Sequence, residues 1–403
     1  MNEDVPINLE EEKSPWLSLA KDAYDSSTSY LDANYRRQWD RNISLFQSQH
    51  PTGSKYHSSQ YQHRSRLFRP KTRSAIRTNE AAVTAAFFAT EDVVSVYPQN
   101  DSDENQRASA TILKHLLQYR LTKSVPWFQT LVGAYQESLV FGSVISHQYW
   151  DYKEEVITTE REVLDQYGQQ VLGETGQPLV DEVKETRVVK DNPVVRLVAS
   201  ENFRIDPAAD WLDPVGTSPF VIEIIPMYLS DVLEKMDTID PKTGDPKWKR
   251  LKIGQLLESS KRTEFDSTRQ TRQGKRQDPL VDRQESVSEY QTIFIHKNIV
   301  RKNGKDWIYY TAGTQHMLSS PKPLRDVYPH LRDGERPYVM GSTVIEAHRT
   351  YPTSLVELTQ DLNLQSVYFA DSLGCMLPDQ INKLFNIFKN NTNIPIGIHA
   401  HNN

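Results

Sequence analysis

The sequence contains one cysteine, Cys375, among 403 residues, so no disulfide can form within the chain. This excludes a disulfide-stabilised secreted domain and favours a reducing compartment during synthesis. Long apolar runs are also missing, because none approaches the ~20 residues that a helix needs to span a bilayer. The acidic start, Met1–Lys13, has no apolar signal-peptide core. We therefore expect no membrane partner, and a disordered lead-in over residues 1–14.

Positive charge is not in excess. Lys and Arg total 47 against 53 Asp and Glu, a net charge of −6. This argues against a protein that coats nucleic acid through a global positive field, but it allows one that encloses DNA without gripping it. Nucleotide-binding signatures such as G-x-x-x-x-G-K-[ST] are absent from the sequence, as are a serine nucleophile elbow and H-E-x-x-H. Up to residue 360 the sequence shows no enzyme signature.

Hydrophobic periodicity predicts an α+β fold that combines helices with β-hairpins. Helices are expected over 15–49, 78–90, 104–122, 125–140 and 229–236. Strands are expected over 93–97, 144–152, 187–225, 290–300, 306–313 and 337–345, with a hairpin insertion over 151–186. The dipeptide Asn303-Gly304 predicts a type I′ turn between two of these strands. The charged segment 237–285 is expected to be an irregular surface excursion.

A basic stretch without acidic residues is the clearest candidate contact surface in the first 360 residues. Its members are Arg64, Arg66, Arg69, Lys71, Arg73 and Arg77. They could contact DNA phosphates, which would be non-specific. The alternative, which we favour, is a solvated segment that pairs with an acidic segment of a neighbouring subunit, such as 151–165.

Four blocks of sequence, in order, resemble those of podovirus-type bacteriophage portal proteins. They are RSRLFRPKTRSAIRTNEAAVTAAFF (64–88), PWFQTLVGAYQESLVFGSVISHQYWDY (126–152), VRLVASENFRIDPAA (195–209) and GERPYVMGSTVIEAHRTYPTSLVELTQDL (334–362). The resemblance covers about residues 20–362. It implies a wing-like domain over 15–228 and a stem- and clip-like region over 229–362.

The same resemblance implies a function that needs no cofactor. Portal proteins form a ring of about a dozen subunits at one capsid vertex, so a homo-oligomer is expected. The packaging motor (terminase) docks on the ring, double-stranded DNA passes through its channel during packaging and ejection, and capsid and tail proteins attach to it. The implied location is the virion, with assembly in the host cytoplasm.

The last forty residues, 363–403, follow a different pattern, strand–helix–strand. Asp371-Ser372-x-Gly374 ends the first expected strand, and Gly397-Ile-His399-Ala-His401-Asn402-Asn403 covers the second. These motifs resemble a fragment of the TIM-barrel metal-dependent aldolases of the pyruvate-carboxyltransferase type. Alternation along a strand puts His399 and His401 on one face. The resemblance implies that they bind a divalent metal (Mn, Mg or Zn) that acts as a Lewis acid on a 2-oxo acid.

Three interpretations remain open from the sequence. The leading one is a portal protein, not an enzyme, with a foreign C-terminal segment. The second is an aldolase with an incomplete barrel, since two strands cannot close an eight-stranded one. The third is a chimeric reading frame.

Overall fold

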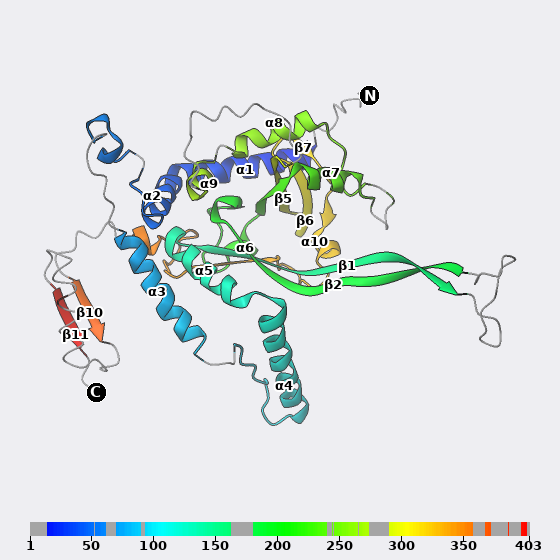
Figure 1. Ribbon diagram of the computed structural model, residues 1–403, viewed down its shortest axis with the longest axis horizontal. Helices are drawn as coiled ribbons and strands as arrows, with labels where there is room; N and C mark the ends of the chain where they lie inside the picture. Colours follow the sequence, from blue (N-terminus) through cyan, green and yellow to red (C-terminus); the bar gives the residue numbers. More distant parts are fainter. Residues whose placement is uncertain are drawn as a thin grey trace. The chain divides into compact units, whose positions relative to one another are not determined.

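The computed structural model describes residues 14–51, 53–61, 70–89, 93–162, 180–239, 244, 246–264, 266–273, 290–357, 367–371, 386 and 396–400. Contacts divide the chain into two compact units, residues 1–354 and 355–403. The first unit combines helices with two antiparallel sheets, which confirms the expected α+β class (Figure 1). None of the described helices is both long and apolar enough to cross a membrane.

A six-stranded antiparallel sheet organises the first unit. Its order is β3-β4-β5-β6-β7, with β8 also paired to β6. The bounds are β3 Phe203–Ile205, β4 Phe220–Tyr228, β5 Thr292–Lys302, β6 Lys305–Ala312, β7 His316–Met317 and β8 Lys322–Pro323. Asn303 and Gly304, both with positive φ (54° and 74°), close the β5–β6 hairpin and confirm the predicted turn.

Alternate residues of the sheet enter two separate cores. Phe294 of β5 packs with Tyr24 and other apolar residues of helix α1 (Pro15–Asn34). Its neighbours Ile293 and Ile295 pack in a second core with α7 (Leu229–Asp237) and α8 (Ile253–Glu264). This follows from the period-two alternation of strand side chains, and it explains why β5 is apolar on both faces.

The remaining helices of the first unit lie mostly before the sheet in the chain. They are α2 Arg36–Phe46, α3 Lys71–Phe87, α4 Glu104–Tyr119, α5 Trp127–Phe141, α6 Pro214–Thr217, α9 Ser267–Arg272 and α10 Leu324–Val327. The predicted helix over 15–49 is two helices, interrupted at Tyr35. The predicted helices over 104–122, 125–140 and 229–236 are confirmed as α4, α5 and α7.

Three local expectations are wrong. Helix α3 begins at Lys71 rather than near Thr78, because Pro70 precedes its first turn and accepts the first helical bond, from Ser74 N–H, at 3.0 Å. Residues 93–97 form no strand; the Val93 N–H instead donates to the Gln118 side chain. Segment 237–285 is not irregular throughout, since it contains α8 and α9, and Leu256 of α8 is fully buried against the sheet.

Strands β1 (Val144–Glu162) and β2 (Val180–Val198) pair antiparallel as a long two-stranded ribbon. The predicted hairpin insertion is therefore confirmed, although its strands extend further than expected. On its other edge, β1 pairs with the short strand β9 (Tyr338–Gly341) only over residues 144–147. Figure 1 shows the ribbon leaving the rest of the unit and twisting toward its tip. Over most of its length neither outer edge is paired within the described part of the chain.

The second unit contains a parallel pair of strands. β10 (Val367–Asp371) lies beside β11 (Ile396–Ala400), with Ala370 opposite His399 and Asp371 opposite Ala400. Parallel pairing is what the strand–helix–strand pattern predicts. The helix expected between them lies outside the described residues except for Asn386, which is helical. Two strands do not test the TIM-barrel resemblance, which stays a prediction.

Candidate assembly surfaces

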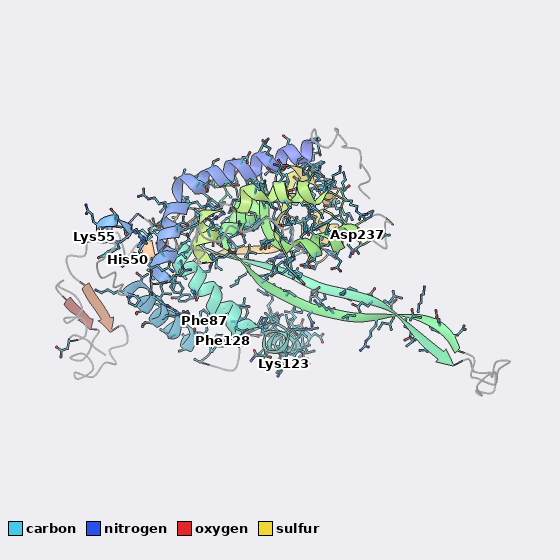
Figure 2. The ribbon with its side chains drawn as sticks, turned by 45° about the horizontal axis from the view of Figure 1, so that its top comes forward. His50, Lys55, Phe87, Lys123, Phe128 and Asp237 are labelled. Carbon is cyan, nitrogen blue, oxygen red and sulfur yellow. The ribbon has the colours of Figure 1, made fainter. Side chains whose placement is uncertain are left out.

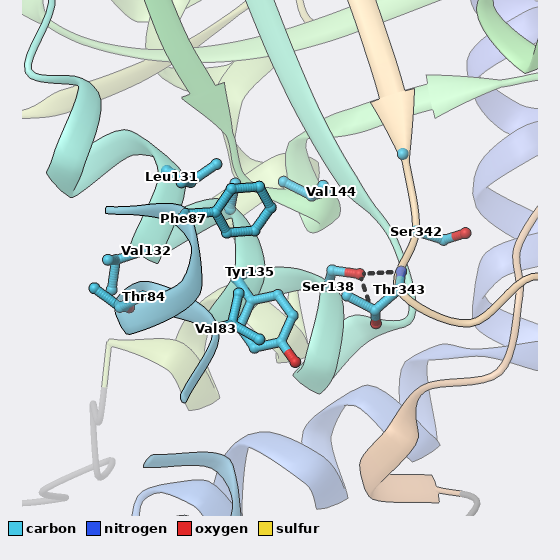
Figure 3. Close-up of a pocket in the computed structure, with 12 residues that line it drawn as sticks. Val83, Thr84, Phe87, Leu131, Val132, Tyr135, Ser138, Val144, Ser342 and Thr343 are labelled. Carbon is cyan, nitrogen blue, oxygen red and sulfur yellow. Dashed lines mark hydrogen bonds between the residues drawn. The ribbon is translucent and has the colours of Figure 1, made fainter. Parts of the chain in front are cut away.

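An apolar groove opens between α3 and α5, beside the ends of β1 and β9 (Figure 3). Its volume is about 240 Å³, several times the ~30 Å³ that one water molecule occupies in the liquid. Ser138 and Thr343 fix one wall, because the Ser138 hydroxyl donates to Thr343 Oγ1 at 3.0 Å and accepts from the Thr343 N–H at 2.8 Å. The rest of the lining is mainly carbon, from Val83, Thr84, Phe87, Leu131, Val132, Ala134, Tyr135 and Val144.

Two exposed aromatic rings add to this apolar surface, Phe87 within the groove lining and Phe128 beyond it. Phe87, at the end of α3, and Phe128, in α5, are both more than half exposed, and Figure 2 labels both. The Phe128 ring lies 5.0 Å from that of Phe88. Contiguous exposed apolar surface of this kind is typical of a protein–protein contact.

Helix α4 carries a second exposed apolar surface. Asp103 caps its start by accepting from the Asn105 N–H, and Ala110 is its one buried residue. We call its exposed apolar residues the α4 stripe; they are Ile112, Leu113, Leu116 and Tyr119. Ile112 is 69% exposed and Tyr119 is 58% exposed. Figure 2 views α4 nearly along its axis, with side chains on every side.

A buried charge network joins the base of the ribbon to the six-stranded sheet. His147 of β1 is the cross-strand partner of Arg196 and of Tyr338, while Glu223 of β4 is the partner of Lys297 in β5. Glu223 accepts from Arg196 at 2.5 Å and from the Tyr338 hydroxyl at 2.7 Å, and Lys297 Nζ lies 3.6 Å from the same carboxylate. Glu223 and Lys297 are almost fully buried. The network therefore joins two cross-strand pairs, His147 with Arg196 in the ribbon and Glu223 with Lys297 in the six-stranded sheet.

Two cations surround His147 and keep its ring neutral. Arg196 lies 3.1 Å from Nδ1 and Lys297 lies 3.1 Å from Nε2. Burial, followed by the charges of Lys297 and Arg196, lowers the pKa of His147 to about 2. Burial also lowers the pKa of Lys297 to about 8, although the Glu223 carboxylate opposes that shift. A neutral imidazole has one acceptor nitrogen, so it can accept a hydrogen bond from only one of the two cations. The negative charge that balances Arg196 and Lys297 comes from the Glu223 carboxylate.

The histidine makes stability pH-dependent. Its pKa is lower in the folded chain than the ~6.5 of an unfolded chain, so the unfolded state binds an extra proton between pH 6.5 and 2. Stability contributed by neutral His147 is therefore lost as the pH falls, by about 2 kcal/mol at pH 5. Urea unfolding at pH 7.5 and pH 5 should show this loss, and His147→Gln should remove about that much of the pH dependence. The exposed His330 provides the control, His330→Gln; an equal change in both variants would contradict the assignment.

The α9 segment is held by ion pairs to residues far away in sequence. Arg272 donates to Glu137 of α5 at 2.7 Å and to the buried Glu201 at 2.7 Å. Asp266, which caps α9, pairs with Arg36 of α2. Because these pairs neutralise its charges, the charged α9 segment can fold against the rest of the unit. They also connect α9 to α5, one of the two helices that form the groove.

The basic candidates predicted from the sequence are only partly described. Lys71, Arg73 and Arg77 lie on the first two turns of α3, and all three are exposed. Arg77 pairs with Glu80 at 2.8 Å and lies over the Phe46 ring. Arg64, Arg66 and Arg69 lie outside the described residues. Contact with DNA or with a subunit stays a prediction for all six.

The aldolase-like candidates are described through their backbone at most. Asp371 ends β10 and His399 lies in β11, one register position apart across the pair. Ser372, Gly374, His401 and Asn402 lie outside the described residues. Within the described residues, no group of three or more His, Cys, Asp or Glu side chains could hold a metal ion. The two histidines stay a predicted metal pair.

Sequence reasoning missed the buried charge network, although a signal was present. Glu223 interrupts the apolar run FVIEIIP, and Lys297 interrupts IFIHKNIV. A single charge within an apolar strand predicts a buried partner. Which two strands pair, and in which register, is not readable from either run.

Comparison with known proteins gives two matches of very different extent. The chain is 40% identical over 60 residues to a 4-hydroxy-2-oxovalerate aldolase from Brevibacillus brevis. That match covers 14% of this chain, and the chain spans only 18% of that aldolase. By contrast, residues 16–366 match the family model described as phage SU10 portal protein. The chain therefore belongs to the phage SU10 portal protein family.

Proposed function

We propose that this protein is a portal subunit that assembles into a ring of about a dozen copies at one capsid vertex. The channel of the ring would conduct double-stranded DNA during packaging and ejection, and its outer surfaces would receive the terminase motor and the capsid and tail proteins. The observation that carries the proposal is the family match over residues 16–366. Its location would be the virion, after assembly in the host cytoplasm.

Two structural features support an assembly role. The groove and the α4 stripe leave apolar surface exposed that a monomer has no use for. Within the described residues, the outer edges of the ribbon are unpaired over most of its length, and an isolated two-stranded ribbon is at best marginally stable in water. Contacts between subunits would cover both.

Mass photometry of the purified protein tests the proposal. The expected result is a closed species of about a dozen times the 46.5 kDa chain mass, with a central opening in electron-microscopy class averages. A protein that stays strictly monomeric over a wide concentration range would count against it.

We propose no enzymatic activity for the second unit. The aldolase match covers 14% of this chain and 18% of that protein, which is too little to carry a proposal of its activity. The family assignment supports a structural rather than a catalytic role.

A further inference from the structure

The α4 stripe is an exposed apolar surface that no described element of its own chain covers. At 100° per residue, Ile112, Leu116 and Tyr119 fall within about 60° of one another around the helix, and Leu113 lies on their flank. A stripe at this spacing normally faces a core. Here its four side chains are 45–69% exposed.

The groove between α3 and α5 is complementary in shape to the α4 stripe. It is concave and its lining is mostly carbon, whereas the α4 stripe lies on the convex face of a helix and is apolar. Insertion of an apolar helix face into an apolar groove is a common mode of protein recognition. Both surfaces belong to one chain, so every copy carries one of each.

We propose that the α4 stripe of one copy docks in the α3–α5 groove of the next copy. The inference rests on the proposed ring, because it names the contact that would join neighbouring subunits. Stripe-to-groove contact is heterologous, and a heterologous contact repeated around an axis closes a ring. Stripe-to-stripe contact would instead give a two-fold dimer and leave every groove empty.

The charges along the two helices favour a parallel arrangement of α4 against α3. On α4 the acidic end at Glu104 lies 12 residues, about 18 Å, before Leu116. On α3 the basic residue Arg73 lies 11 residues, about 17 Å, before the groove residue Thr84. When Leu116 enters the groove, the start of α4 comes level along the helix axis with the basic turns of α3. That start carries Asp101, Asp103 and Glu104 against one base, Arg107, which lies 3.8 Å from Glu104; Glu104 itself lies about 120° around α4 from Leu116.

Adjacent residues of α4 provide a matched pair of variants. Ile112→Glu places a charge in the stripe, and Thr111→Glu places the same charge about 100° away on an exposed position. We expect Ile112→Glu to weaken assembly at least tenfold in mass photometry, since charged groups are excluded from interface centres. Thr111→Glu should assemble like the parent. Circular dichroism should show the same helix content in both.

The groove is altered from the other side by Val132→Glu, and independently by Thr84→Phe, which fills the cavity without adding charge. Each should likewise weaken ring assembly at least tenfold. Mixing the stripe variant with a groove variant is the decisive measurement, because the pair retains one intact stripe and one intact groove. The mixture should form dimers and nothing larger.

The possible outcomes separate the inference from the proposed function. Rings that persist in the stripe and groove variants would overturn the docking contact and leave the portal assignment intact. Variants that stay monomeric when mixed would also overturn it, since another occupant would then fill the groove. A parent protein that never forms rings would overturn both.

Discussion

Replacing Glu223 with alanine should lower the free energy of unfolding by about 3–5 kcal/mol, because it leaves the buried Lys297 ammonium without its counter-charge. Arg196 and the Tyr338 hydroxyl lose their acceptor at the same time. The urea midpoint, followed by circular dichroism at one protein concentration, measures the loss.

An exposed ion pair on the ribbon provides the control for this prediction. Glu185 pairs with Arg161 at 2.5 Å, but both side chains are about half exposed or more. Glu185→Ala should therefore cost about 0–1 kcal/mol. The double variant Glu223→Gln/Lys297→Met should recover much of the loss, because it removes both charges. If it were no more stable than Glu223→Ala, the cost would not come from the unpaired lysine.

Replacing Gly142 with alanine should destabilise the first unit by about 2–4 kcal/mol, the combined cost of a left-handed backbone and a steric clash. Gly142 ends α5 with φ +88°, and its N–H donates to Ser138 O at 2.9 Å. A Cβ at this position would lie 2.1 Å from the Pro352 carbonyl oxygen. That segment cannot move away freely, because Asn42 donates to the Ser354 hydroxyl at 2.9 Å.

A variant at Gly334 distinguishes the cost of the left-handed backbone from the cost of the steric clash. Its φ is +84°, close to that of Gly142, but no atom lies within 4 Å of the position a Cβ would take. Gly334→Ala should therefore show the backbone cost alone, about 1 kcal/mol. Equal thermal-unfolding shifts for the two variants would argue against the close contact with Pro352.

Local signals predicted the elements that depend on local chemistry. The β5–β6 hairpin follows from Asn303-Gly304, and α4 follows from its apolar spacing. Helix α9 was missed because its stability comes from Glu137 and Glu201, more than 60 residues away. The exposure of the α4 stripe could not be predicted either, since an amphipathic pattern indicates a face to be covered and not what covers it.

The candidate surfaces also differ in whether local sequence could predict them. The basic residues of α3 were identified from composition, whereas the groove beside them is formed by α3, α5, β1 and β9 together. Its lining comes from segments around residues 83–87, 131–138 and 341–343, so no single stretch of sequence contains a signal for it.

The ribbon's register shift has a consequence for how its two halves can vary. Between Lys153 and Glu154 the pairing shifts by one residue, from Lys153↔Lys190 to Glu154↔Val188. Such a bulge sharpens the local twist and changes which β2 side chains share a face with those of β1. The attached half, near His147, and the acidic outer half are thus two paired segments in series, each with its own register. Residues can be added or removed in cross-strand pairs in the outer half, two from each strand at a time, without turning any side chain of the attached half to the other face. The length of the ribbon and the side chains on its outer half can therefore change independently of the buried charge network that attaches it.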